Sequence, residues 1–134
     1  MSLRLSKHHG LGNDFLVALV DHLPRDASAK AAEWCDRRTG VGADGLIFGL
    51  PSSAGDISMR LWNSDGSAAE LSGNGLRCFG QAVARSQSAA TLELDVDTPA
   101  GIRHCSIHPS ADPATVVATV DMGVVNPGPN PDVT

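Results

Sequence analysis

The chain has 134 residues, of which 42% are hydrophobic, and its formal net charge is −5 at pH 7. This length suits one domain with a buried core. The acidic balance argues against a nucleic-acid partner, because binding to phosphates needs a basic face. Three cysteines without a pairing pattern fit reduced thiols in the cytoplasm better than a disulfide framework. The apolar runs are strand-length, so we expect neither a signal peptide nor a membrane span.

The first half of the chain predicts strands separated by glycine-rich turns. Leu3–His8 alternates apolar and polar residues, and F-L-V-A-L-V, residues 15–20, follows the turn G-L-G-N-D as a buried strand. A short helix is expected through A-K-A-A-E-W-C-D-R-R, residues 29–38, with Asp26 or Ser28 as its cap. Further strands are expected at residues 45–50, 57–62 and 68–71.

The second half predicts one longer helix and three more strands. Helical spacing begins near Asn74, with Leu76, Phe79 and Val83 near one face. Residues 91–96, 101–108 and 115–122 alternate as half-buried antiparallel strands do. We therefore expect an α+β domain over residues 1–122, with a mostly antiparallel, strongly curved, barrel-like sheet around a central helix. The proline-rich residues 123–134 are expected to form a linker towards a second half that this sequence does not contain.

The sequence S-G-N-G lies between an expected strand and the longer helix, which places Ser72 at or near the helix N-cap. The free N–H groups of a first helical turn favour an anion such as a carboxylate or phosphate, and Gly73 and Gly75 allow a ligand to approach the backbone closely. The alternative is a capped helix with a purely structural role. Residue spacing alone does not decide between the anion-binding and the structural interpretation of this segment.

Two asparagines, Asn13 and Asn63, lie beside glycines at strand ends. An asparagine both donates and accepts hydrogen bonds, so two or three that converge suit a ligand carrying ammonium and carboxylate groups. Taken singly, each asparagine is equally explained by a local turn. The loop T-G-V-G-A-D-G lacks the Lys-Ser/Thr ending of a phosphate loop, so we expect no nucleotide site.

The histidines and cysteines do not predict a metal site. His8 and His9 are neighbours in a strand and face opposite ways, whereas His104 and His108 share a face without visible partners. The cysteines on the expected helices, at positions 35 and 78, are interpreted as small buried hydrophobic residues.

Three blocks taken together resemble diaminopimelate epimerase. They are K-H-H-G-L-G-N-D-F, D-R-R-T-G-V-G-A-D-G-L and R-L-W-N-S-D-G-S-A-A-E-L-S-G-N-G-L-R-C-F, which occur in the family's order between Lys7 and Ala84, and V-D-M-G resembles the strand that closes the family's N-terminal half. The resemblance implies two pseudo-symmetric halves, each a sheet wrapped around a central helix, with the active site in the cleft between them.

The resemblance also implies the chemistry. It implies a cofactor-independent interconversion of LL- and meso-diaminopimelate for lysine and peptidoglycan-precursor synthesis, in which one thiolate removes the α-proton and a thiol on the other face returns one. Backbone N–H groups at two helix N-termini would hold the α-carboxylate. Four residues match substrate-binding positions: Asn13, Asn63, Gly73 and Asn74. The resemblance suggests structural roles for His9 and Asp44, no metal, and a homodimer.

Two departures from the family pattern change the expectation. Ser72 stands where the family has its cysteine base, and a serine hydroxyl is a weak base unless another group activates it. The chain is also about half a family member, so the second cysteine must come from a missing half or a second chain. We expect no epimerase turnover from this chain alone. Two alternatives remain: an enzyme like the proline racemases and hydroxyproline dehydratases, which G-N-G in place of G-H-G disfavours, and a non-catalytic binding or assembly domain of the same fold.

Overall fold

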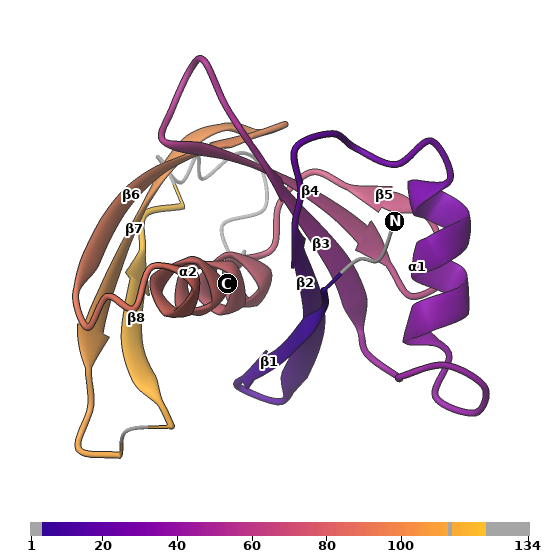
Figure 1. The fold of residues 1–134 in the computed structure, drawn as a ribbon, viewed down its shortest axis with the longest axis horizontal. Helices are drawn as coiled ribbons and strands as arrows, with labels where there is room; N and C mark the ends of the chain where they lie inside the picture. The colour runs from indigo at the N-terminus through magenta and orange to yellow at the C-terminus, as the bar shows by residue number, and fades with distance from the viewer. Residues whose placement is uncertain (1–3, 113, 123–134) are drawn as a thin grey trace, which may run out of the picture.

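A single curved sheet and two helices account for the regular structure of the computed structural model, which describes residues 4–112 and 114–122 (Figure 1). The strands are β1 (Ser6–Gly10), β2 (Asn13–Leu19), β3 (Gly45–Leu50), β4 (Ile57–Asn63), β5 (Ala68–Ala69), β6 (Leu92–Thr98), β7 (Gly101–Pro109) and β8 (Val116–Val120). The helices are α1 (Ala27–Cys35) and α2 (Gly73–Ser86).

The sheet is mostly antiparallel, as the sequence predicted. Its order is β1-β2-β3-β4-β6-β7-β8, with β5 paired to the second half of β4. Two neighbouring pairs, β2 with β3 and β4 with β6, are parallel. Parallel neighbours need a crossover connection, and here α1 lies in the first crossover and α2 in the second. The two helices therefore mark the two places where the sheet is mixed.

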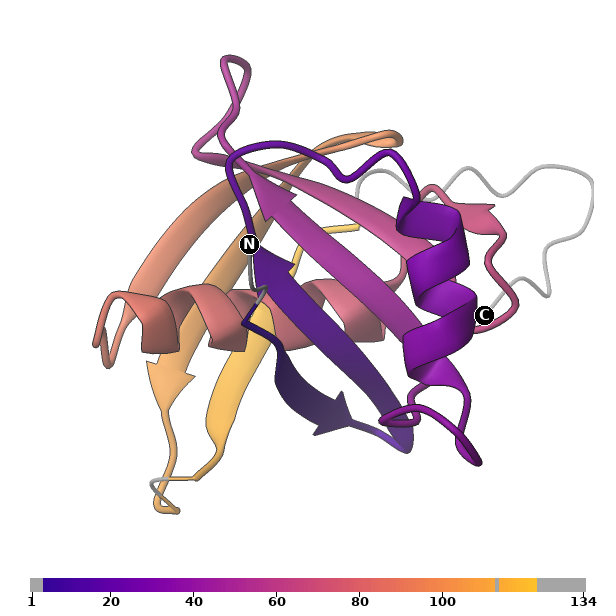
Figure 2. The same ribbon diagram turned by 45° about the vertical axis from the view of Figure 1, so that its right-hand side comes forward.

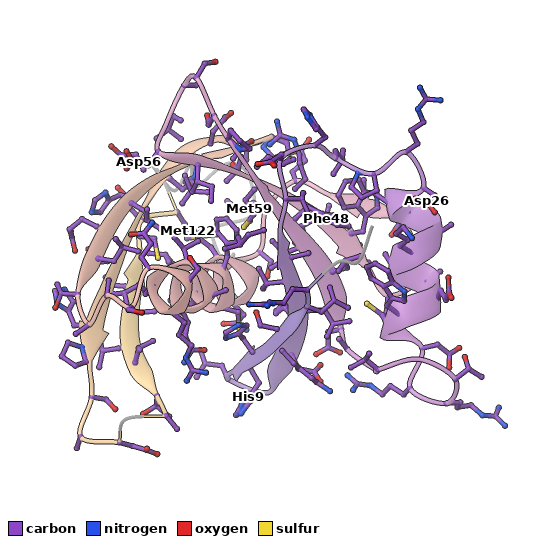
Figure 3. All side chains as sticks on the ribbon, viewed as in Figure 1. His9, Asp26, Phe48, Asp56, Met59 and Met122 are labelled. Atoms are coloured by element: carbon purple, nitrogen blue, oxygen red, sulfur yellow. The ribbon has the colours of Figure 1, made fainter. Side chains whose placement is uncertain are left out.

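The curved sheet separates two hydrophobic cores. Helix α2 lies inside the curve, and α1 lies against the outer face (Figure 2). The inner core holds Met59 and Phe79, and the outer core holds Phe48 and Ala31, all four with 0% exposure. Figure 3 shows Met59 on the α2 side of the sheet and Phe48 on the α1 side. The predicted central helix is confirmed, because the sheet wraps around α2.

Strand register brings three loops to one end of the sheet. In one row across the strands, Phe15 pairs with Gly45, and Gly45 pairs with Asn63. The residues just before β2, just before β3 and at the end of β4 are therefore neighbours at this end. Helix α2 begins at the same end, because Asn74 contacts Asn13 directly. The fold thus gathers four segments that are far apart in sequence.

Several predicted boundaries were wrong by a few residues, and α1 shows why. The helix ends at Cys35 and not at Arg38, because the Asp36 side chain accepts hydrogen bonds from the backbone N–H groups of Arg38 and Thr39. Such a local bond competes with helix continuation. Asp26 is the N-cap residue but makes no side-chain cap hydrogen bond. The linker expected at residues 123–134 lies outside the described residues. None of the described helices is long and apolar enough to cross a membrane.

Candidate active site

The N-terminus of α2 forms the centre of the candidate site. Ser72 is the N-cap in an extended conformation, and its Oγ accepts a hydrogen bond from the backbone N–H of Gly75 at 3.0 Å. The carbonyl of Ser72 accepts the first helical bond, from Leu76. The N–H groups of Gly73 and Asn74 have no acceptor within the helix, because the first turn of any helix leaves its donors free. No acidic residue lies in this turn, so it can hold an anion.

This helix end is partly exposed, because Ser72, Gly73 and Asn74 are all half-buried. A Cβ placed on Gly73 would have its nearest neighbours, the Arg77 guanidinium and the Met122 side chain, at 3.6 Å. These are ordinary contact distances, so a Cβ would fit there, and Arg77 and Met122 pack against this side of Gly73. Met122 lies next to α2 with 41% of its surface exposed (Figure 3). A ligand can therefore reach the backbone of the first turn.

Asn13 and Asn74 are joined across the site. The Nδ2 of Asn74 donates to the Oδ1 of Asn13 at 2.7 Å, and the Nδ2 of Asn13 donates to the Oδ2 of Asp44 at 3.2 Å. Asn13 follows a tight turn in which Leu11 and Gly12 have φ values of 53° and 87°. This conformation matches the turn of a two-residue hairpin between β1 and β2 and is costly for leucine. The turn delivers Asn13 to the helix end, where its side chain meets that of Asn74.

A reciprocal pair of aspartates holds the starts of β2 and β3 together. The backbone N–H of Asp14 donates to the Asp44 carboxylate at 2.9 Å, and the N–H of Asp44 donates to the Asp14 carboxylate at 3.0 Å. Arg37 bonds both oxygens of Asp14, at 3.1 and 2.8 Å, and one oxygen of Asp44 at 3.3 Å. The Arg37 guanidinium holds the pKa of Asp14 well below its usual range. Asp44 thereby serves the structural role expected of it, since the same carboxylate also orients Asn13.

Asn63 lies at the same end of the sheet but belongs to a turn of its own. Its Nδ2 donates to the Ser67 hydroxyl at 3.1 Å, and its carbonyl accepts from the Gly66 N–H at 2.9 Å. The next residue, Ser64, donates its N–H to the carbonyl of Asp44, which ties this turn to the start of β3. The exposed Asn63 thus borders the site without entering the Asn13–Asn74 pair, and its contact with substrate stays a prediction.

None of the three cysteines provides a thiolate. Cys35, Cys78 and Cys105 are buried, and burial raises the pKa of each thiol, to about 11 for Cys78 and Cys105. The interpretation of Cys35 and Cys78 as small buried hydrophobic residues is confirmed. At the helix end, the oxygen of Ser72 is engaged with a backbone N–H group and has no basic side chain among its hydrogen-bond partners within the described residues. Among the described residues, no side chain that could act as a base therefore hydrogen-bonds to the Ser72 oxygen.

Three residues of this network were not assigned from the sequence: Asp14, Arg37 and Arg77. Arg77 donates to the Oδ1 of Asn74 at 3.2 Å. The spacing of three residues along a predicted helix was a usable signal for this contact. The contacts of Asp14 with Arg37 and Asp44 carry no such signal, because these partners are 23 and 30 residues away in sequence. They could be found only once the strand register was known.

The histidines of β7 belong to a surface cluster away from this site. His104 bonds Asp95 at 2.9 Å and Glu93 at 2.8 Å, both on β6, and His108 lies 3.9 Å from Glu93. The two carboxylates raise the pKa of His104. Within residues 4–112 and 114–122, no group of three or more His, Cys, Asp or Glu side chains is arranged to hold a metal ion. The histidines of β7 and the carboxylates of β6 therefore form a set of ion pairs across two strands.

Solved structures of similar shape define the class of fold. The chain superposes with a TM-score of 0.67 on a protein described as a predicted epimerase from Pseudomonas aeruginosa, at 16% identity, covering 90% of this chain and 43% of that one. A hydroxyproline epimerase from Agrobacterium vitis gives a TM-score of 0.64 at 18% identity, covering 81% of this chain and 38% of that one. These likenesses show the fold alone: the chain shares the architecture of about two fifths of each of these proteins.

The sequence comparisons identify the family. The family model described as Diaminopimelate epimerase matches residues 5–127, and the chain belongs to this family. Two relatives named diaminopimelate epimerase illustrate the match. The one from Desulforudis audaxviator is 45% identical over 123 residues, covering 90% of this chain and 44% of the relative. The one from Bacteroides thetaiotaomicron is 41% identical over 122 residues, covering 90% and 45%. The chain thus spans less than half the length of these curated relatives.

Proposed function

We propose that this chain is the substrate-binding N-terminal half of a cofactor-independent amino-acid epimerase that interconverts LL- and meso-diaminopimelate in the cytoplasm, for lysine biosynthesis. One observation carries the proposal. The N–H groups of Gly73 and Asn74, which have no acceptor among the described residues, lie beside the Asn13–Asn74 pair at one half-buried helix end, in a member of the diaminopimelate epimerase family. Each element suits an amino-acid carboxylate: a helix dipole, backbone donors and amide donors.

In this proposal the helix end has two tasks. It binds the α-carboxylate of the substrate, and it stabilises the negative charge that spreads onto that carboxylate when the α-proton leaves. Donors fixed in advance stabilise such a charge well, because they need no reorganisation during the reaction. The hydrogen bonds of Asp44 and Arg77 to the two asparagines fix the donors in this way. Asn63, at the edge of the site, contacts a more distant part of the substrate.

The chemical step needs groups that this chain does not supply. Ser72 occupies the position of the family's thiol base, and its hydroxyl cannot readily become an alkoxide without a neighbouring base. The second thiol belongs to the remaining half of a family member, so a C-terminal half or a second chain is the required partner. Alone, this chain binds substrate weakly and does not turn it over.

Ser72 also favours a second candidate function. A chain that keeps the fold and the helix end but has lost the thiol suits a non-catalytic binding or assembly domain. The alternative of a proline racemase-like enzyme draws on shape alone, since the hydroxyproline epimerase from Agrobacterium vitis is only 18% identical. Ligand binding at the α2 N-terminus separates the substrate-binding half from an assembly domain.

The test is an NMR titration of the ¹⁵N-labelled chain with diaminopimelate. We expect shifts of the backbone amides of Gly73 and Asn74 and of the Asn13 side-chain amide, with a millimolar Kd because only one half of the site is present. The matched control is 1,5-diaminopentane, which has both amines and neither carboxylate and should leave these signals unchanged. The proposal fails if diaminopimelate at about 50 mM, far above a millimolar Kd, moves none of them.

A further inference from the structure

Arg77 lies one turn into α2 and contacts the start of the helix at two points. Its Nη1 donates to the Oδ1 of Asn74 at 3.2 Å. The same atom lies 3.6 Å from the position that a Cβ on Gly73 would take. The half-buried guanidinium therefore lies against the two residues whose backbone N–H groups are free, and it adds positive charge to the end of the helix that already favours anions.

The hydrogen bonds form a chain with a defined direction. Arg77 donates to Asn74, Asn74 donates to Asn13, and Asn13 donates to Asp44. An arginine can only donate, and an ionised aspartate can only accept. At one end Arg77 requires that the oxygen of the Asn74 amide faces it, and at the other Asp44 requires that the nitrogen of the Asn13 amide faces it. Neither amide can turn over without losing a charge-assisted hydrogen bond.

This direction decides what the two asparagines can offer a ligand. Each oxygen already accepts a hydrogen bond within the protein, from Arg77 or from Asn74. Each amide nitrogen carries two hydrogens, and one hydrogen of each is used in the chain of bonds. The second hydrogen of each nitrogen is left for a ligand. The pair consequently presents one N–H donor of each amide in a fixed direction, which suits a carboxylate, and each oxygen keeps one lone pair.

We propose that Arg77 is a positioning residue, which fixes the Asn74 amide and through it the direction of the donor pair at the carboxylate site. It does not act on the reacting atoms. The identity of the ligand comes from the proposed function, whereas the orienting contact rests on the hydrogen bonds alone. Asp44 holds the far end of the chain, so loss of Arg77 acts first on Asn74.

The test measures solvent exchange of the side-chain NH₂ groups of Asn74 and Asn13 by NMR in the 134-residue chain. Arg77→Met keeps the apolar stem and removes every donor. We expect the Asn74 NH₂ group to exchange about five-fold faster, as loss of one hydrogen bond implies. Arg77→Lys, with one flexible donor group, should restore part of the protection. Arg85→Met is the matched control, because Arg85 is on the same helix and donates to the carbonyl of Ala114.

The exchange rates decide whether Arg77 orients the amide. Unchanged Asn74 exchange and chemical shifts in Arg77→Met, as in Arg85→Met, overturn the proposal. If Arg77→Met does not give a folded spectrum, Arg77→Gln is measured against the same criterion. A merely structural role of Arg77 would change backbone protection along α2, and the orienting role predicts that this protection stays as in the unmodified chain.

The second readout links the contact to the ligand. In diaminopimelate titrations, Arg77→Met should raise the Kd about five-fold and Arg85→Met should leave it unchanged. An equal Kd for Arg77→Met and the unmodified chain overturns the positioning role even where the exchange rates differ. Absence of binding in all three proteins contradicts the proposed function instead, and the exchange rates still decide whether Arg77 fixes Asn74.

Discussion

Replacing Ser72 with cysteine should create the one reactive thiol of the chain. Its sulfur would stand at the N-cap of α2, where the backbone N–H of Gly75 now donates to the serine oxygen. A helix N-terminus lowers the pKa of a thiol from about 8.5, here to roughly 7.5, because it stabilises the negative thiolate. Burial, by contrast, raises the pKa of Cys78 and Cys105 to about 11. The variant therefore places two kinds of thiol in one protein.

The expected difference in reactivity follows from these values. At pH 8 roughly three quarters of a thiol with pKa ~7.5 is thiolate, against about one part in a thousand at pKa 11, a ratio of nearly 10³. The lower-pKa thiolate is intrinsically less nucleophilic by roughly 40-fold, since nucleophilicity falls with a slope of about 0.45. The thiol of Ser72→Cys should therefore react about 20-fold faster than Cys78 or Cys105, before the slower access of the reagent to these buried native thiols is included.

A disulfide reagent such as 5,5′-dithiobis(2-nitrobenzoate) measures this directly by absorbance. Ser72→Cys should release one equivalent of thiolate in a fast phase, with a pH midpoint below 8.5, and the unmodified chain should lack this phase. A fast phase with its midpoint at or above 8.5 would show that the helix end gives an anion no stabilisation, contrary to this prediction. The three native thiols serve as the internal control in both proteins.

Two further outcomes test the packing and the charges of the fold. A Cβ on Gly80 would lie 2.6 Å from the Cys105 sulfur and 2.8 Å from the Cδ1 of Ile107. Gly80→Ala should therefore lower the free energy of unfolding by about 1–2 kcal/mol, because overpacking costs more than the gain in helix propensity. Adding Cys105→Ala should recover only part of the loss in urea unfolding, and no loss in the single variant would contradict the packing of α2 on β7. The two β6 carboxylates raise the pKa of His104 above 6.5, so its stabilising effect is complete below pH 6.5 and is lost as pH rises through the folded-state pKa. The stability difference between the unmodified chain and His104→Gln should therefore shrink from pH 6 to pH 9, and an NMR pKa of His104 at or below 6.5 would rule this out.

Local patterns allowed most of the fold to be predicted. Alternation along Ile57–Asn63 and Gly101–Pro109 marked strands, because one face of each meets the core and the other meets solvent. Ser72 marked the start of α2, because serine is a preferred N-cap. The two parallel strand pairs could not be predicted, because they depend on how the crossover helices pack and not on any single segment.

The candidate site also combines residues that local patterns predict with contacts that local patterns do not predict. Gly73 and Asn74 follow from the helix start, which is local. The Asn13–Asn74 bond joins residues 61 apart, and the contact between Asn13 and Asp44 spans 31. These contacts depend on strand register, which no local pattern of residues specifies. The isolated asparagines predicted donors and acceptors without an orientation, and the direction of the hydrogen-bond chain fixes how each amide faces.

The central claim is that this chain retains the carboxylate-binding half of an epimerase site and lacks its thiol. The most direct test joins the chain, with Ser72 or with Ser72→Cys, to the C-terminal half of the relative from Desulforudis audaxviator, with the intact relative as the positive control. The assay follows exchange of the α-hydrogen of diaminopimelate with solvent deuterium and conversion of the LL to the meso form. We expect conversion by the cysteine protein and none by the serine protein. Equal conversion by both, or no gain from the cysteine while the intact relative is active, would contradict it.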